Sequence, residues 1–361
     1  MPSETPKYRE IINFLKQEIY TGHLRNGDRL DTEDELGACF GVSRQTVRRA
    51  LSEMTHEGLI ESRRGSGSYV VYRPELRRRK SKMIGVVTTY LDTYIFPGII
   101  RGIEREVTAA GYTLQLALTQ NRTDSEQKAL QTMMDNGVDG IILEPAKSAL
   151  PSPNAGLYEQ IQSMGISLLF INGYCPGLRI PHVSLDDRAA GCAATEALLQ
   201  AGHTKIGGIF KIDDYQGHLR CEGYLQAMRV AGAELSDSRV LWYSTENREL
   251  PAEQILDRLN DCTAIVCYND ELAVRVFSLL QGAHILVPGQ VSLASIDDSD
   301  LSRLGPVSLT SVIHPKIELG VTAARQLLRM MAGESFDATM EFRAELRAGR
   351  SIQRIGETPA R

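Results

Sequence analysis

The sequence predicts two folded parts: a small α+β head of three helices and a β-hairpin, and a larger α/β body of two parallel-sheet lobes. Three observations support this division. Residues 1–72 carry helical patterns and then two short strand patterns, whereas residues 83–361 alternate strand and helix patterns. A charged, proline-containing stretch at 73–82 separates the two parts. The length of 361 residues is also enough for two or three domains.

Charge is distributed unevenly along the chain. Residues 1–82 hold 16 lysines and arginines against 12 acidic residues, whereas the remainder holds 24 against 33. A basic head on an acidic body favours a polyanionic partner for the head alone. The six cysteines show no metal-ligand spacing, which favours buried thiols and predicts no metal site. The N-terminus is polar and no apolar run reaches membrane-spanning length, so we expect a cytoplasmic protein without a membrane partner.

The head begins with two predicted helices. Apolar residues at helical spacing predict the first over residues 8–20, ended by Gly22. A second helix is expected over residues 33–40. Thr32 is its N-cap and Glu35 stands three residues later, which is the pattern of a capping box.

The third helix organises the head. Gly41 can take the positive φ of a tight turn, and Ser43 can N-cap a helix that runs to about Glu57 and stops at Gly58. One face of this helix is apolar. The other carries side chains that contact base edges and phosphates: Arg44, Gln45, Arg48 and Arg49. Two helices joined by such a turn predict a helix-turn-helix, although an ordinary amphipathic surface helix would show the same pattern.

A β-hairpin is expected over residues 59–71, with a basic, glycine-rich turn. Three helices and such a hairpin form a winged helix-turn-helix. Arg64, Gly65 and Gly67 lie at the tip of the wing. This tip could lie against a phosphate or enter the minor groove, because glycine lets the backbone approach closely.

The head resembles the DNA-binding domain of GntR-type repressors. The resemblance rests on the segments 36–51, 58–60 and 64–70. It implies DNA contacts from the wing and from Lys7, Arg44, Thr46 and Arg48.

The stretch 73–82 is interpreted as a hinge between the two parts. Five of the six residues from Arg77 to Lys82 are basic. They could touch DNA, or they could only keep the hinge extended by self-repulsion, and the sequence leaves both possibilities open.

In the body, strand and helix patterns alternate over about 280 residues, which predicts parallel sheets in two lobes with a cleft between them. The expected strands cover 83–89, 114–118, 138–144, 167–172, 205–210, 264–268 and 291–296. The expected helices cover 97–111, 126–136, 157–164, 189–201, 220–231, 271–281 and 316–331.

Ligands of open α/β sheets bind at the carboxyl ends of the strands. The residues placed there by the sequence combine aromatic rings, carboxylates, amides and cations, which suits a small polyhydroxylated ligand. The candidates are Thr89, Tyr90, Tyr94, Phe96, Glu144, Lys147, Asn172, Asp186, Arg220, Asn269, Asp297 and His314. For any single carboxylate, a helix cap or a solvated loop is an equally good interpretation.

The body resembles the LacI/GalR-type effector domain, which is related to periplasmic sugar-binding proteins. The resemblance rests on the motifs at 202–206, 220–224, 268–273, 287–293 and 309–312. It implies that the body supplies a homodimer face and that ligand hydroxyls are held by Arg220, Asn269 and Asp297.

A GntR-type head on a LacI-type body is an uncommon pairing, and it resembles the arabinose-responsive repressors. The segments that carry this resemblance are 84–90, 94–97, 100–104, 144–150 and 312–316. They imply L-arabinose or a related sugar as the effector, whereas composition and spacing indicate only a cleft that suits a polyol.

The resulting hypothesis is a dimeric repressor whose two heads read a palindromic operator and whose sugar ligand shifts the body between states. An enzyme is not expected, because the chain has no phosphate-cradling loop with lysine, no GxSxG and no metal-ligand cluster, and no cofactor is predicted. A transport-type sugar-binding protein is opposed by the DNA-binding head. A regulator of the same architecture for a different sugar stays open.

Overall fold

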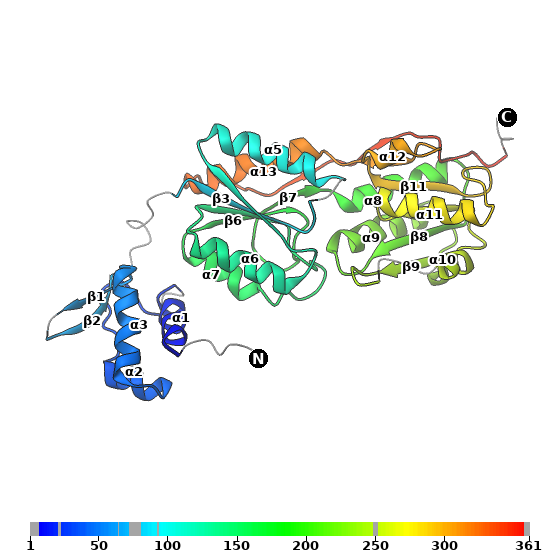
Figure 1. Ribbon diagram of the computed structural model, residues 1–361. Coiled ribbons are helices and arrows are strands. Elements are labelled where there is room, and N and C mark those ends of the chain that lie inside the picture. The colour runs from blue at the N-terminus through cyan, green and yellow to red at the C-terminus, as the bar shows by residue number, and fades with distance from the viewer. Residues whose placement is uncertain are drawn as a thin grey trace. The chain divides into compact units, whose positions relative to one another are not determined.

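The structure is a computed structural model that describes residues 7–20, 23–63, 65–71, 81–91, 94–247 and 252–356. Its head and body are described separately (Figure 1). The predicted fold classes are confirmed: the head is a winged helix-turn-helix, and the body holds two α/β lobes. Residues 72–80, which include most of the predicted hinge and its basic run, lie outside the described residues.

The head contains α1 (Lys7–Tyr20), α2 (Glu33–Phe40) and α3 (Arg44–His56), followed by the antiparallel strands β1 (Ile60–Arg63) and β2 (Gly67–Val70). All three predicted helices are present close to their expected bounds, whereas Gly22, the expected end of the first, lies outside the described residues. One apolar cluster joins the helices to the hairpin. Its members include Ile11, Leu15, Leu36, Val47, Met54, Ile60 and Val70.

The predicted caps are confirmed. The Thr32 hydroxyl accepts a hydrogen bond from the Glu35 amide at 3.3 Å, and the Thr32 amide donates to the Glu35 carboxylate at 2.7 Å. Gly41 has φ +61°, the left-handed conformation that the turn into α3 requires. The Ser43 hydroxyl accepts from the Thr46 amide at 3.3 Å. These local bonds fix the entry into both helices of the helix-turn-helix.

The first lobe of the body is built on a six-stranded sheet with the order β13-β7-β6-β5-β3-β4. Its strands are β3 (Met83–Thr88), β4 (Thr113–Leu118), β5 (Gly140–Leu143), β6 (Ser167–Asn172), β7 (His182–Leu185) and β13 (Met340–Phe342). The helices between or after these strands are α5 (Phe96–Ala109), α6 (Thr123–Asp135), α7 (Ala155–Ser163) and α13 (Lys316–Met331). Helices α5 and α13 lie side by side against one face of the sheet (Figure 1).

The second lobe has its own six-stranded sheet, in the order β14-β12-β11-β10-β8-β9. Its strands are β8 (Ile206–Lys211), β9 (Val240–Tyr243), β10 (Ala264–Cys267), β11 (Ser292–Asp297), β12 (Thr310–Ile313) and β14 (Glu345–Arg347). Its helices are α8 (Asp187–Gln200), α9 (Tyr215–Val230), α10 (Ala252–Arg258), α11 (Asp270–Gly282) and α12 (Leu301–Leu304), with a short 3₁₀ turn, η1, at Asp237–Arg239. In this sheet every described pairing is parallel except that of β12 with β14, so the predicted parallel-sheet lobe carries one antiparallel edge strand.

The chain passes between the lobes three times: from β7 to α8, from β12 to α13, and from β13 to β14. Each lobe is therefore assembled from separate stretches of sequence. The carboxyl ends of the strands in both sheets meet around one cavity, which the next subsection describes.

The sequence pattern did not predict several short elements. These are the strands β7, β9, β12, β13 and β14, each of four residues or fewer, and the helices α10 and α12. Elements this short show no measurable periodicity. Among the described residues, no helix is long and apolar enough to cross a membrane.

Candidate functional site

The first candidate site is the exposed face of α3. Val47, Ala50, Leu51 and Met54 turn inward into the core of the head. Arg44, Gln45, Arg48 and Arg49 are exposed on the opposite face, and Thr46 is half-buried with its hydroxyl 3.0 Å from that of Ser43. The helix therefore offers three guanidinium groups and an amide on one surface.

Two of these arginines are paired with acidic residues of α2. The Arg44 guanidinium lies 2.7 Å from the Asp34 carboxylate, and that of Arg48 lies 3.0 Å from Glu33. Hydrogen bonds from Arg48 hold the pKa of Glu33 below its usual value. Sequence reasoning missed both pairs, because it considered α3 without the first turn of α2. A DNA phosphate or base must compete with these carboxylates for the arginines.

The other predicted residues of the head lie at the start of α1 and in the wing. Lys7 is the exposed first residue of α1. The Arg49 guanidinium lies over the ring of the neighbouring Tyr8, 4.0 Å from its centroid. Gly65 and Gly67 take φ +77° and +111° in the wing. A Cβ on Gly67 would lie 3.1 Å from the guanidinium of Arg29, a residue that the sequence did not single out. Arg64 lies outside the described residues.

The second candidate site is a cavity of about 410 Å³ in the body, lined by both lobes. Nine of the twelve predicted ligand residues line it: Thr89, Tyr90, Tyr94, Phe96, Glu144, Asn172, Arg220, Asn269 and Asp297. Its lining also includes residues outside the predicted set: Ile95, Lys211, Asp214, Gln216, Tyr243, Thr245, Tyr268, Glu271, Leu272, Arg275 and Leu301.

Arg220 is the electrostatic centre of the cavity. Its side chain is 1% exposed and donates to Asp187 at 2.7 Å, to the Tyr268 carbonyl at 2.7 Å and to Asp297 at 3.3 Å. Burial opposes the charged form of Arg220, but the two carboxylates outweigh it and raise the pKa well above the ordinary value. Burial also opposes the charged form of Asp187 and so raises the pKa of this carboxyl to about 6. A guanidinium fixed in this way presents oriented donors to a ligand.

Arg220 belongs to α9, which begins at Tyr215 and not near residue 220 as the sequence pattern indicated. Glycines bring α9 and α8 unusually close together. A Cβ on Gly191 would lie 2.0 Å from the Arg220 carbonyl, and one on Gly223 would lie 2.0 Å from that of Arg188. This close packing places Asp187, the first residue of α8, beside Arg220.

Asp297 ends β11 and connects the two lobes. It accepts a short hydrogen bond from the Tyr94 hydroxyl of the first lobe. Asp297 and Asp298 both have positive φ, at +106° and +39°, which is strained for these residues. The buried Asp270 supports this turn by accepting from the hydroxyls of Ser295 at 2.5 Å and Ser299 at 2.9 Å.

Glu144 is the buried carboxylate of the first lobe. One oxygen accepts from the Thr88 hydroxyl and from the amide and hydroxyl of Thr89, at 2.9, 2.7 and 2.6 Å. The other accepts from the Asn172 amide at 2.6 Å. Burial raises the pKa of Glu144, although these bonds oppose the shift. The oxygen with one partner keeps capacity to accept from a ligand hydroxyl.

Three predicted ligand residues lie outside the cavity lining. Asp186 caps α8 by accepting from the Ala189 amide at 2.9 Å, the alternative role that the sequence had left open for such carboxylates. His314 is buried behind the lining, and its Nε2 lies 2.9 Å from the side-chain amide oxygen of Asn172. Lys147 pairs with Glu246 of the other lobe.

The arrangement suits a neutral, hydroxyl-rich ligand. Anionic and cationic groups are both present and mostly paired, and the rings of Tyr90 and Phe96 lie 6.2 Å apart on one side. Sugar hydroxyls both donate and accept, while their C–H faces pack on rings. Among the described residues, no group of three or more His, Cys, Asp or Glu side chains is arranged to hold a metal ion.

Two family models match separate parts of the chain. Residues 7–70 match the bacterial regulatory proteins of the gntR family, and residues 195–352 match the periplasmic binding protein-like domain. Among solved structures, the transcriptional regulator CelR in complex with cellobiose superposes with a TM-score of 0.68 at 21% identity, covering 89% of this chain and 100% of that one. This likeness supports the fold.

Two full-length relatives share the whole architecture. An arabinose metabolism transcriptional repressor of Halalkalibacterium halodurans is 35% identical over 93% of this chain and 92% of its own length. Another, from Geobacillus stearothermophilus, is 35% identical over 97% of this chain and 98% of its own. The paired arginine-bearing head and cleft-bearing body thus have a common origin with theirs, and the chain belongs to the family of arabinose metabolism transcriptional repressors.

Proposed function

We propose that this protein represses transcription as a homodimer on a palindromic operator, and that L-arabinose bound in the body releases it. The observation that carries the proposal is the cavity centred on Arg220, with Asp297 and Glu144 from opposite lobes, in a chain 35% identical to arabinose metabolism repressors. The sugar is bound and released without chemical change, because the cavity residues serve as hydrogen-bond partners. Since operator DNA is the partner, the protein works in the cytoplasm.

The cavity volume supports a small sugar. About 410 Å³ lies within the range of natural ligand sites and accommodates a monosaccharide. We propose that Arg220, Asn269 and Asp297 of the second lobe and Glu144 of the first bind its hydroxyls, while Tyr90 and Phe96 pack against its C–H face. A ligand held from both sides favours one arrangement of the lobes over others.

The sugar assignment is tested by calorimetry of the full chain against L-arabinose and a panel of pentoses and hexoses. L-arabinose should bind more tightly than its stereoisomers and should weaken binding to operator DNA in a gel-shift titration. If L-arabinose neither binds nor changes operator affinity, the effector assignment is wrong. If another sugar of the panel binds more tightly, the proposed architecture stands and that sugar replaces L-arabinose as the effector.

The DNA-binding role is tested by the double variant Arg44→Ala, Arg48→Ala. These side chains are exposed, so the fold should be retained. Loss of base and phosphate contacts should reduce operator affinity at least a hundredfold. Sugar binding should stay within error of the unsubstituted protein. Operator binding that survives the double change would contradict the assignment of α3.

The homodimer is supported by the edge strand of the first lobe. Leu116 and Leu118 are exposed on β4, which has a neighbour on one side only. One head covers few base pairs, so two heads on a two-fold axis are needed for operator specificity. Sedimentation should give a dimer, and an operator with one half-site should bind far more weakly than the palindrome. A monomer that binds both operators equally would refute this part.

A further inference from the structure

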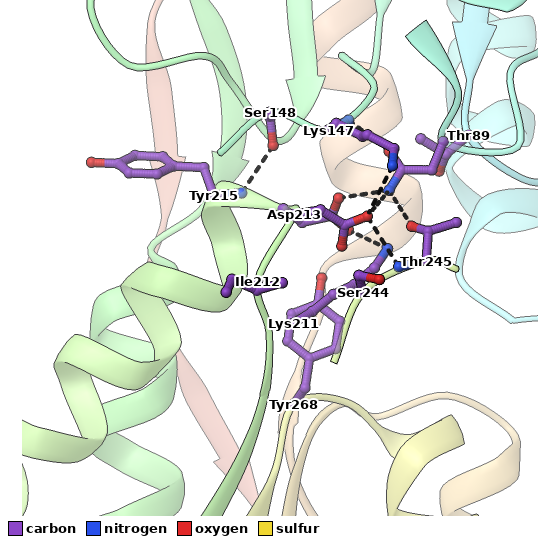
Figure 2. A network of polar contacts seen from close by, with 12 residues as sticks. Thr89, Lys147, Ser148, Lys211, Ile212, Asp213, Tyr215, Ser244, Thr245 and Tyr268 are labelled. Atoms are coloured by element: carbon purple, nitrogen blue, oxygen red, sulfur yellow. Dashed lines mark hydrogen bonds and ion pairs between the residues drawn. The ribbon is translucent and has the colours of Figure 1, made fainter. Parts of the chain in front are cut away.

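On one side of the cavity, a network of polar contacts joins loops of the two lobes. The first lobe contributes the loops after β4 and β5, and the second contributes those after β8 and β9. Figure 2 shows Lys147 and Ser148 of the first lobe facing Asp213, Tyr215 and Thr245 of the second. Because strands of both sheets end here, a change in the lobe arrangement must alter these contacts.

Asn121, in the loop after β4, is the centre of this network. Its amide nitrogen lies 2.6 Å from the Thr245 hydroxyl, 2.9 Å from the Asp214 carboxylate and 3.4 Å from the Asp213 carboxylate, all in the second lobe. Its amide oxygen accepts from the backbone N–H of Lys147 at 2.7 Å. The side chain is fully buried, and φ is +57°. Both hydrogens and the oxygen of the amide are thus committed.

Asn121 does not line the cavity, but its two nearer acceptors, Asp214 and Thr245, do. Asp214 also receives the Lys211 ammonium at 2.6 Å, and Lys211 is a further lining residue. The Asn121 amide therefore fixes the rotamers of Asp214 and Thr245, and through Asp214 the position of Lys211. A first-lobe residue orients part of the second-lobe wall.

Backbone amides near Asn121 also donate hydrogen bonds from one lobe to the other. The Tyr215 amide, at the start of α9, donates to the Ser148 hydroxyl at 3.0 Å. The Ala149 amide donates to the Asp213 carbonyl at 3.3 Å. All these contacts are polar, so water can replace them when the lobes separate, at a small net cost for each bond. This chemistry permits reversible closure.

We infer that Asn121 is a positioning residue for the sugar site. It holds Asp214 and Thr245 in their binding orientation only when the lobes adopt the arrangement seen here. Formation of the cavity wall and closure of the lobes are then one event. The inference rests on the proposed sugar-binding function and adds to it a residue that need not touch the sugar.

The test is Asn121→Gly in the full chain, with Gln120→Gly as the matched control. Both positions have positive φ, which glycine accepts, and they are adjacent in one loop, but the Gln120 side chain is exposed. Asn121→Gly should raise the dissociation constant for L-arabinose about tenfold, mainly through faster dissociation, because the hydrogen bonds of its amide nitrogen across the lobes are lost. Gln120→Gly should change it less than twofold.

Asn121→Asp is a second variant with nearly the same shape, which guards against failure of the glycine variant to fold. It replaces the donor by a carboxylate beside Asp213 and Asp214, so sugar affinity should fall further at pH 8 than at pH 5. A merely structural role would lower the melting temperature of these variants without this pH-dependent loss.

Two outcomes separate the hypotheses. If the unsubstituted protein binds L-arabinose and both Asn121 variants bind it equally well, Asn121 is not a positioning residue and the proposed function stands. If the unsubstituted protein binds neither L-arabinose nor any sugar of the panel, the proposed function fails, and this role of Asn121 fails with it.

Discussion

At the scale of single residues, the arginines of α3 are held in place before DNA arrives. Asp34 pairs with Arg44 and Glu33 with Arg48; Glu33 is half-buried and the other three side chains are exposed. Exposed ion pairs contribute little to stability, so their main effect is on the electrostatic potential of the DNA-facing surface. Each carboxylate lowers the positive charge that DNA would meet.

We therefore predict that Asp34→Asn strengthens operator binding about fivefold at moderate salt, because a competing charge is removed. Fluorescence anisotropy of a labelled operator at several salt concentrations measures this. Glu57→Gln is the matched control, since Glu57 pairs with Lys16 at the other end of α3 and the same charge is lost. Weaker binding of Asp34→Asn would mean that Asp34 is needed to orient Arg44.

His314 gives the body a pH-dependent stability. Burial lowers its pKa to about 4, and the ring stays neutral in the folded protein above that pH. In the unfolded chain it takes up a proton near pH 6.5. Protons therefore bind preferentially to the unfolded state between these values, and folded stability falls as the pH decreases through this window.

The corresponding prediction compares the unsubstituted protein with His314→Gln, whose amide can still donate to Asn172. From pH 7.5 to pH 4.5 the unsubstituted protein should lose about 2 to 3 kcal/mol more free energy of unfolding than the variant. Urea unfolding of both proteins at the two pH values measures the difference. Parallel losses would show that another group dominates acid destabilisation.

At the scale of elements, the contact of α8 with α9 determines the geometry of the sugar cavity. Gly191 allows this contact, because a Cβ there would lie 2.0 Å from the Arg220 carbonyl. Gly191→Ala should destabilise the body by about 2 to 4 kcal/mol through overpacking and should weaken sugar binding by displacing Arg220. Thermal unfolding and calorimetry test this. Gly282→Ala, in α11 where the added Cβ meets open space, should be neutral or slightly stabilising.

At this scale, an element could be predicted from the sequence when the residues that determine its bounds lie close together along the chain. The caps of α2 and α3 were predictable, because each involves residues three apart. The start of α9 was not, since the Tyr215 amide is satisfied by Ser148, 67 residues earlier. Strands β13 and β14 have three residues each and form only because their neighbours provide sheet edges.

The candidate site followed the same rule. Glu144, Asn172 and Asp297 were found because apolar strand patterns mark where each strand ends. Lys147 and His314 also follow strands, yet neither lines the cavity: Lys147 pairs with Glu246, and His314 contacts Asn172 from outside. Asp187 and Asn121 gain their roles from partners in distant segments, which a single sequence without aligned relatives does not reveal.

At the scale of the whole molecule, three crossings of the chain make the body a pair of lobes that can change their relation without unfolding. The contacts that would resist such a change include polar ones, such as Tyr94 with Asp297 and Asn121 with Thr245. A sugar that binds residues of both lobes adds to them. Its effect on DNA affinity can be no larger than its preference for one lobe arrangement.

Linkage then predicts a reciprocal effect. If saturating L-arabinose lowers operator affinity by a given factor, expected to be about 5- to 150-fold, saturating operator must lower the affinities of the two sugar sites of the dimer by factors whose product equals it. Anisotropy with and without sugar gives the first ratio, and calorimetry with and without operator gives the second. In the Arg44→Ala, Arg48→Ala variant, added operator should leave sugar affinity unchanged, because no complex forms. If the operator ratio of the unsubstituted protein differs from the product of its two sugar-site ratios, the sugar acts on DNA binding through a further site, and the cavity between the lobes does not account for release of the operator.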